Sequence, residues 1–137
     1  MASGPAHQTE ASAQRIVISV DAMGSDRGPV AIVAGLALCA TSLPNADFIL
    51  HGDEAQLAAL LSRHAGLSQR VTLRHAPRVV TMQDKPSQVM RHGEGTSMWS
   101  TIESVKQGEA TVAVSCGNTG ALMAVAMIRL RKLPGVN

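Results

Sequence analysis

Four short apolar runs, separated by longer segments of helical pattern, are the feature that most limits how this chain can fold. The runs resemble buried strands and cover residues 16–20, 48–51, 71–75 and 110–115. Helices are predicted at residues 29–42, 53–66, 87–92, 97–107 and from residue 118 onward. Strands that alternate with helices form an open, mostly parallel sheet with helices on both faces. The sequence therefore predicts an α/β fold.

Length and composition indicate one domain in a reducing compartment. The chain has 137 residues, of which 45% are hydrophobic and 16% are charged, so it can build a core. Residues 1–15 have neither an apolar centre nor a basic flank, which predicts a mobile tail rather than a signal peptide, before an α/β portion at 16–137. No apolar stretch reaches the roughly 20 residues of a membrane-spanning helix. Two isolated cysteines, Cys39 and Cys116, favour reduced thiols and a cytoplasmic location.

Charge and residue type argue against nucleic acid and metal as ligands. Twelve Lys and Arg residues face ten Asp and Glu residues, and Phe48 and Trp99 are the only aromatic side chains. A nucleic-acid surface needs a basic patch or stacking aromatics. The histidines and cysteines have no metal-ligand spacing, so neither a metal nor a nucleic-acid partner is predicted.

The loop after the first strand, DAMGSDRGP at residues 21–29, contains two glycines and two carboxylates before a helix. Free N–H groups at the start of that helix could hold a phosphate, with Arg27 as counter-charge. In the alternative, Asp21 and Asp26 only cap backbone groups in a turn. Spacing alone favours the turn, because the loop matches neither a dinucleotide-binding nor a P-loop motif.

The loop after the fourth strand, CGNTG at residues 116–120, is the better candidate for an anion site. Asn118 is a good helix N-cap, Thr119 can donate its hydroxyl, and Gly117 and Gly120 allow a ligand to approach the backbone. In the alternative, Asn118 caps the helix and Gly120 packs against the sheet, and spacing does not separate the two. Cys116 could be a nucleophile at a helix start, but a small buried thiol is the favoured interpretation.

Residues 79–99 carry the densest polar cluster of the chain. It comprises Asp84, Lys85, Arg91, His92 and Glu94. Lys85 precedes a proline, so its backbone is extended and its ammonium group could reach over a cleft. In the alternative, these side chains form a solvated surface loop. Cys39 lies within an apolar predicted helix, and we expect it in the core.

Five stretches together resemble one protein family. They are IVISVDAMGSDRGP, ILHGDE, HAPRVVTMQDKPSQVMR, TSMWSTIESVKQGEA and VSCGNTGALMA followed by LPGV. In this order they closely resemble the amino-terminal part of the bacterial acyl-acyl carrier protein:phosphate acyltransferases of phospholipid synthesis. The resemblance covers residues 16–136, well under half of a usual family member. It departs at Ser25, where the family has glycine, at Cys116, where it has a small residue, and at Thr96, where it tends to have serine.

The resemblance implies a function for the complete enzyme. That enzyme would transfer a fatty acyl group from the thioester of acyl carrier protein to inorganic phosphate, with a fold like phosphotransacetylase and isocitrate dehydrogenase. The resemblance further implies a homodimer in the cytoplasm, peripheral membrane association, and no cofactor or metal. A severed portion of this kind is expected to be inactive alone.

The resemblance also suggests roles for site residues. Lys85, Asn118 and Thr119 would be catalytic, steadying phosphate or the oxyanion. The substrate-binding residues would be Asp21, Gly24, Ser25, Asp26, Ser97, Gly117 and Gly120. Asp21 and Asp26 would repel phosphate directly, so we expect them to orient backbone N–H groups. Two other classes stay open, namely a non-catalytic phosphate- or nucleotide-binding module and a fragment that acts only with a partner chain.

Overall fold

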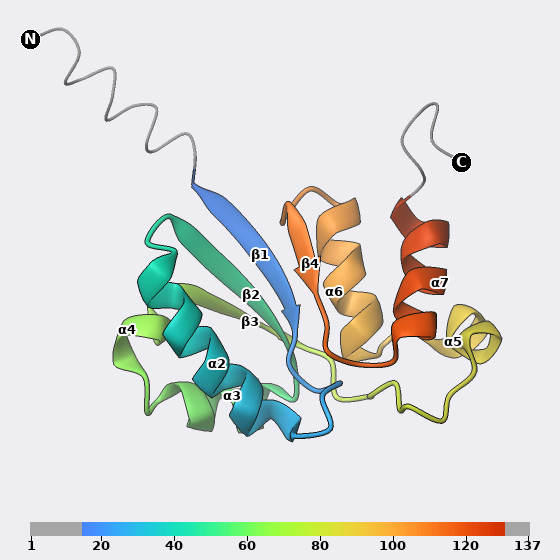
Figure 1. Ribbon diagram of the computed structural model, residues 1–137, viewed down its shortest axis with the longest axis horizontal. Helices are drawn as coiled ribbons and strands as arrows, with labels where there is room; N and C mark the ends of the chain where they lie inside the picture. The colour runs from blue at the N-terminus through green and yellow to red at the C-terminus, as the bar shows by residue number, and fades with distance from the viewer. Residues whose placement is uncertain (1–14, 131–137) are drawn as a thin grey trace, which may run out of the picture.

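An all-parallel sheet of four strands organises residues 15–130, which are the residues that the computed structural model describes (Figure 1). The strands are β1 (Ile16–Asp21), β2 (Ala46–Gly52), β3 (Val71–His75) and β4 (Val112–Val114). Their order across the sheet is β3-β2-β1-β4, and each neighbouring pair is parallel. The predicted α/β fold with a parallel sheet is confirmed.

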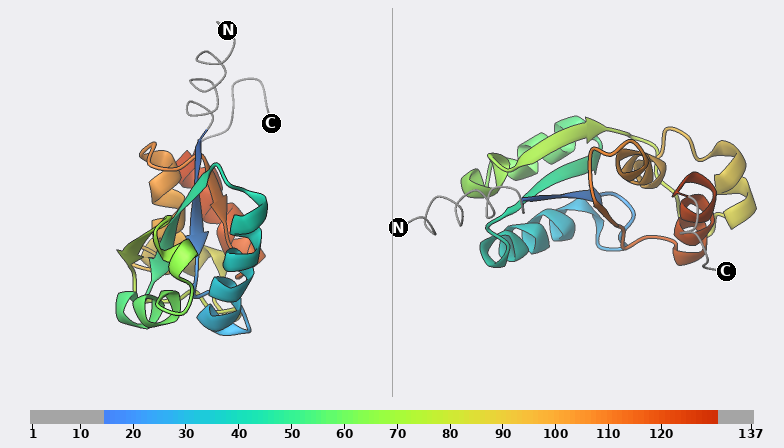
Figure 2. Two further views of the ribbon diagram at one scale, coloured as in Figure 1. Left: turned by 90° about the vertical axis from the view of Figure 1, so that its left-hand side faces the viewer. Right: turned by 90° about the horizontal axis from the view of Figure 1, so that it is seen from above.

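Helices cover both faces of this sheet. They are α2 (Gly28–Ser42), α3 (Glu54–Leu61), α4 (Ala65–Ser68), α5 (Pro86–His92), α6 (Ser97–Lys106) and α7 (Thr119–Leu130). Figure 2 shows α2 and α6 on opposite sides of β1. The face under α2, α3 and α4 holds a core that includes Val20, Leu50, Val33, Leu57 and Leu67. A second core joins α5, α6 and α7 through Val89, Met98, Ile102, Ala121 and Val125.

Two predicted element boundaries are wrong. The fourth strand is shorter than residues 110–115, because the backbone N–H groups of Glu109 and Ala110 both donate to Ser104 O in the turn after α6. The second predicted helix does not run to Gly66. It ends at Leu61, and Gly66 lies inside the separate short helix α4. Gly66 was therefore a misleading signal for the end of α3.

Cys39 is exposed rather than in the core. Helix α2 is apolar on nearly every side, so the pattern could not show which side meets the sheet. Val33 and Ala40 face the sheet, whereas Leu38 beside Cys39 is 74% exposed. Residues 1–14 of the predicted tail, and the predicted end of the last helix beyond Leu130, lie outside the described residues.

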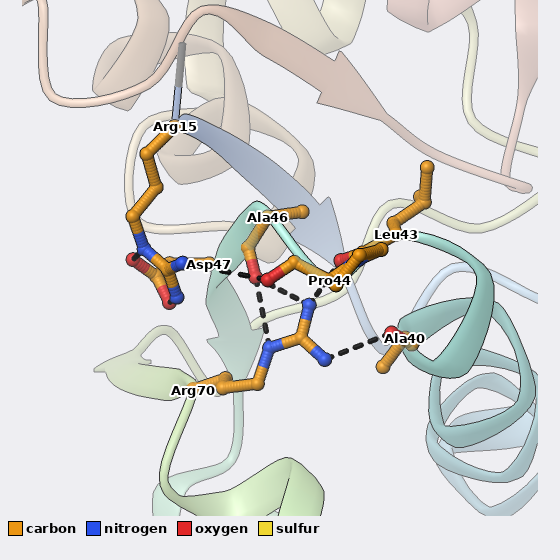
Figure 3. A network of polar contacts seen from close by, with 7 residues as sticks. All are labelled: Arg15, Ala40, Leu43, Pro44, Ala46, Asp47 and Arg70. Atoms are coloured by element: carbon orange, nitrogen blue, oxygen red, sulfur yellow. Dashed lines mark hydrogen bonds and ion pairs between the residues drawn. The ribbon is translucent and has the colours of Figure 1, made fainter. Parts of the chain in front are cut away.

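Arg70, the residue before β3, connects that strand to the C-terminal end of α2 and to the start of β2 (Figure 3). Its guanidinium donates to Ala40 O at 2.8 Å, to Ala46 O at 2.6 and 3.0 Å, and to Leu43 O. The carbonyls of Ala40 and Leu43 lie at the negative end of the α2 dipole, where a cation is stabilising. Nearby, Arg15 forms two hydrogen bonds with Asp47 at 2.6 and 2.7 Å and lowers the pKa of that carboxyl.

A buried histidine connects the sheet to α6. His51 on β2 has no exposed surface, and its Nε2 lies 2.7 Å from Ser19 Oγ on β1. Ser19 donates its own hydrogen to Thr101 O at 2.9 Å, so it accepts from His51 Nε2–H. The other nitrogen, Nδ1, lies 2.6 Å from Ser100 Oγ and accepts its hydrogen. The imidazole is therefore neutral and satisfied on both sides.

Candidate functional site

Three loops meet at the carboxyl ends of β1 and β4, where ligands bind in open α/β sheets (Figure 1). The first follows β1, the second joins β4 to α7, and the third is the segment between β3 and α5. A methyl group built on Gly24 of the first loop would lie only 3.2 Å from Gly117 Cα of the second. Neither glycine has a positive φ, so close approach rather than backbone conformation accounts for glycine at both positions.

Asp21 locks the first loop to the second. Its carboxylate is 1% exposed, and it accepts from Met23 N at 3.0 Å and from Ser115 Oγ at 3.0 Å. Ser115 Oγ in turn accepts from Gly117 N at 3.1 Å. The bond from Met23 N fits both alternatives for Asp21, namely a cap in a turn and the orientation of a backbone N–H for a ligand. Sequence reasoning missed Ser115, although a small polar residue between a strand and a glycine was a usable signal.

Ser25 and Asp26, the other polar residues of the first loop, make no contact with the second loop among the described hydrogen bonds. Ser25 Oγ accepts from Arg27 N at 3.2 Å and stabilises the turn before α2. Asp26 is exposed, and its carboxylate accepts no hydrogen bond within residues 15–130, so the expected orienting role is not seen for it. Met23, Gly24, Ser25 and Asp26 line an open pocket of about 440 Å³, whose other wall is residues 79–83. We call it the loop pocket.

Alanine at Gly24 is expected to lower the free energy of unfolding by about 2 kcal/mol, as overpacking does in a close-packed site. Its methyl group would lie 2.7 Å from Asp21 Oδ2 and 3.2 Å from Gly117 Cα, and neither atom can move cheaply. Gly35→Ala in α2 is the matched control, because its methyl group meets no atom within 4 Å. Urea unfolding of both variants and of the unsubstituted protein measures the effect. A Gly24→Ala variant as stable as the unsubstituted protein would contradict the prediction.

Asn118 connects the second loop to the third. Its Oδ1 accepts from Ala121 N at 3.1 Å, which confirms the predicted N-cap of α7. Its Nδ2 donates to Thr81 O at 3.1 Å and to Asp84 O at 2.8 Å. An amide nitrogen has two hydrogens, so both are engaged. In this geometry the side chain holds the third loop in place and has no donor left for a ligand.

The start of α7 nevertheless offers donors. The backbone N–H groups of Asn118, Thr119 and Gly120 have no hydrogen-bond partner among the described residues. Thr119 is exposed at this helix start. A methyl group on Gly120 would lie 3.2 Å from Pro86 Cγ, so this glycine allows the third loop to approach. Unpaired N–H groups at a helix start favour an anion.

Lys85 follows Asp84, whose carbonyl accepts from Asn118, and Ser97 lies at the start of α6. The Lys85 side chain is exposed and forms no ion pair with residues 15–130, while its backbone N–H donates to Gln88 Oε1 at 3.2 Å. Ser97, in the first turn of α6, has no exposed surface. Its Oγ is the one buried side-chain polar atom in the described part of the chain without a hydrogen-bond partner. Such a hydroxyl can satisfy a ligand or a water molecule.

Neither a thiol nucleophile nor a metal centre is indicated by the geometry. Cys116 is exposed rather than buried, which overturns the small-core interpretation, and none of the histidines within residues 15–130 is hydrogen-bonded to it. Within residues 15–130 no three His, Cys, Asp or Glu side chains gather as metal ligands would. In the same part of the chain, no helix is long and apolar enough to cross a membrane.

Comparison with known proteins gives a consistent result. Residues 16–137 match a family model described as "Fatty acid synthesis protein". A phosphate acyltransferase of Cereibacter sphaeroides strain KD131 is 72% identical over 137 residues, covering 100% of this chain and 37% of the relative. A phosphate acyltransferase of Paracoccus denitrificans is 66% identical over 122 residues, covering 89% of this chain and 33% of the relative. The chain thus spans about a third of the length of the curated relatives it matches.

Proposed function

The chain belongs to the family of fatty acid synthesis proteins, and on that premise we propose that it is the amino-terminal α/β portion of an enzyme that transfers a fatty acyl group from acyl carrier protein to inorganic phosphate. The observation that carries the proposal is 72% identity over the whole chain to a phosphate acyltransferase. The geometry supports it, because three loops meet where the reaction would need an anion site. The product would be an acyl phosphate for phospholipid synthesis.

In the proposed reaction a phosphate oxygen attacks the carbonyl carbon of the thioester directly. A carbon–oxygen bond forms, the carbon–sulfur bond breaks, and the sulfur leaves with a proton as the free thiol of the carrier. Phosphate would be held by the unpaired N–H groups at the start of α7, with the Thr119 hydroxyl beside them. Such donors, aimed where negative charge develops, stabilise the tetrahedral oxyanion. No enzyme nucleophile is needed, and Cys116 would have no catalytic part.

The other site residues take supporting roles in this proposal. Lys85 would supply positive charge at the mouth of the site, and Ser97 would hydrogen-bond a substrate oxygen or a bound water. Asp21 and Ser115 would fix the spacing of the two glycine loops, and Asn118 would hold the third loop, which carries Lys85. Gly24, Ser25 and Asp26 would bound the pocket for the incoming substrate.

The proposal also includes a homodimer, a cytoplasmic location and peripheral contact with the membrane. Exposed apolar side chains support a further covering partner, whether the rest of the enzyme or a second copy. Val30 and Leu38 on α2 are 58% and 74% exposed, and Met123 and Met127 on α7 are 60% and 56% exposed. Apolar surface of this kind marks an interface.

The function is testable in a chimeric enzyme, in which residues 1–137 replace the corresponding part of the Cereibacter sphaeroides relative. Purified chimera, acyl carrier protein thioester and radiolabelled phosphate should yield labelled acyl phosphate. A chimera that folds and binds phosphate but forms no acyl phosphate would favour the non-catalytic phosphate-binding module instead.

Two substitutions in α7 separate chemistry from loop support. Thr119→Val in the chimera should lower kcat about a hundredfold, the usual effect of removing one oxyanion donor, and leave stability unchanged. Asn118→Ala should lower both kcat and stability, because the third loop loses its two hydrogen bonds. Cys116→Ala, two positions before Asn118, is the matched control and should keep normal turnover. Steady-state kinetics and urea unfolding measure these effects. Normal turnover in Thr119→Val would show that this loop has only a structural role.

A further inference from the structure

A second pocket lies between the third loop and α5. Its walls include Arg78, Val80, Asp84, Gln88, Val89 and His92, and its volume is about 270 Å³. We call it the Arg78 pocket. Val79 and Val80 line both this pocket and the loop pocket, so the two share one wall.

The guanidinium of Arg78 is held rigidly and lacks a negative partner. Nη1 donates to Glu94 O at 2.8 Å and Nη2 donates to His92 O at 2.9 Å, both of them backbone carbonyls. The arginine backbone is also fixed, because Arg78 O accepts from Ser97 N at 2.9 Å. The ion pairs within residues 15–130 join Arg15 to Asp47, Arg74 to Glu109 and Arg129 to Glu103, so Arg78 takes part in none of them, and the carboxylate in its pocket lining is that of Asp84.

A pre-positioned arginine outside any ion pair of the described residues suits an anionic ligand of the phosphate type. Its two carbonyl contacts use two of five N–H donors, which leaves donors for oxygens of a phosphate group. The rest of the pocket lining contains both apolar and polar side chains. Val80 and Val89 provide apolar wall, while Asp84 and Gln88 provide polar atoms at the edge. Such a lining suits a ligand that combines a phosphate group with a chain of both apolar and polar parts.

Because Val79 and Val80 line both pockets, a ligand in the Arg78 pocket would lie next to the loop pocket. Two substrates that react must meet at one point, so their sites must adjoin. The loop pocket lies beside the Gly24 loop, which approaches the loop before α7, and the Arg78 pocket adjoins it through Val79 and Val80. A chain lying in the Arg78 pocket could place its far end near the phosphate donors.

We infer that the Arg78 pocket binds the phosphopantetheine arm of the acyl carrier, with Arg78 on its phosphodiester and the valine wall along its methylene and amide chain. The inference rests on the proposed function, since it names the site of that reaction's second substrate. An alternative is that Arg78 binds inorganic phosphate, and a second is that this surface contacts only the carrier protein.

The test uses the chimeric enzyme with His92→Trp, which fills the pocket from its rim. His92 is exposed and its side chain makes no hydrogen bond within the described residues, so the fold should tolerate the change. Arg91→Trp is the matched control, an exposed neighbour that does not line the pocket. KM is measured for acyl carrier protein thioester, for free acyl-phosphopantetheine and for phosphate, and circular dichroism checks folding.

We expect His92→Trp to raise KM at least tenfold for both acyl donors, to leave KM for phosphate unchanged, and to weaken phosphopantetheine binding in calorimetry by the same factor. Arg91→Trp should leave all three values unchanged. A rise in KM for phosphate alone would assign the pocket to phosphate and overturn the inference. A rise for the carrier but not for the free arm would overturn it in favour of protein docking.

The proposed function can fail separately from this inference. If the unsubstituted chimera forms no acyl phosphate, the function is wrong, and calorimetry with phosphopantetheine still tests the pocket. If the chimera is active and His92→Trp leaves every KM unchanged, the function stands and the pocket assignment is wrong.

Discussion

The 137-residue chain alone is expected to form no acyl phosphate from acyl carrier protein thioester and phosphate, whereas the chimeric enzyme forms it readily. The chain spans 37% of the length of the Cereibacter sphaeroides relative, and both pockets at its candidate site are open. Holding two reactants in the right geometry accounts for roughly 7–11 kcal/mol of barrier lowering, or five to eight powers of ten in rate. Half of a cleft cannot hold both substrates in this way.

The same chain should associate with itself. Strand β4 has a hydrogen-bonded neighbour on one side only, and Val112 and Val114 on it are 44% and 43% exposed. An exposed apolar edge strand pairs readily with other chains. The measurement is acyl phosphate formation followed together with light scattering, and the chimera serves as the positive control. Robust turnover by a monodisperse monomer would show that the active site is complete within these residues.

Acidification should destabilise the fold by about 3 kcal/mol between pH 6.5 and pH 4 through His51 alone. Burial, followed by the positive charge of Arg74, lowers the pKa of His51 from 6.5 to about 4. Each pKa unit corresponds to about 1.36 kcal/mol. In this pH range the unfolded chain binds a proton that the folded chain does not, so the free energy of unfolding falls as pH falls. Well above pH 6.5 both states are neutral and His51 contributes no pH dependence.

Urea unfolding at pH 7.5 and pH 4.5, followed by the fluorescence of the single Trp99 on α6 and at protein concentrations below those that scatter light, measures this effect. His51→Gln should remove most of the pH dependence, whatever it does to stability at pH 7.5. His92→Gln on α5 is the matched control, since that histidine is exposed, and should keep the dependence. An unchanged pH dependence in His51→Gln would assign it to other groups.

Much of the fold could be predicted because it depends on local pattern. Short β-branched runs and helical segments alternate along the chain, and a parallel sheet follows from that alternation. Asn118 could be recognised as an N-cap because the bond from Ala121 N to its Oδ1 spans three positions. The loops of the candidate site could be located for the same reason, since the carboxyl ends of parallel strands lie at one edge.

The sequence by itself therefore determined the order of the elements, the edge of the sheet where a site would lie, and the family. Only the tertiary structure decided what the side chains there are doing. The bonds from Ser115 to Asp21, from Asn118 to Thr81 and Asp84, and from His51 to Ser19 and Ser100 join positions 32 to 94 residues apart. Which side of α2 is buried, and hence the exposure of Cys39, also depended on packing, because a helix that is apolar all round does not specify its buried face. Contacts between distant residues depend on how the elements pack together, and local periodicity carries no record of that packing.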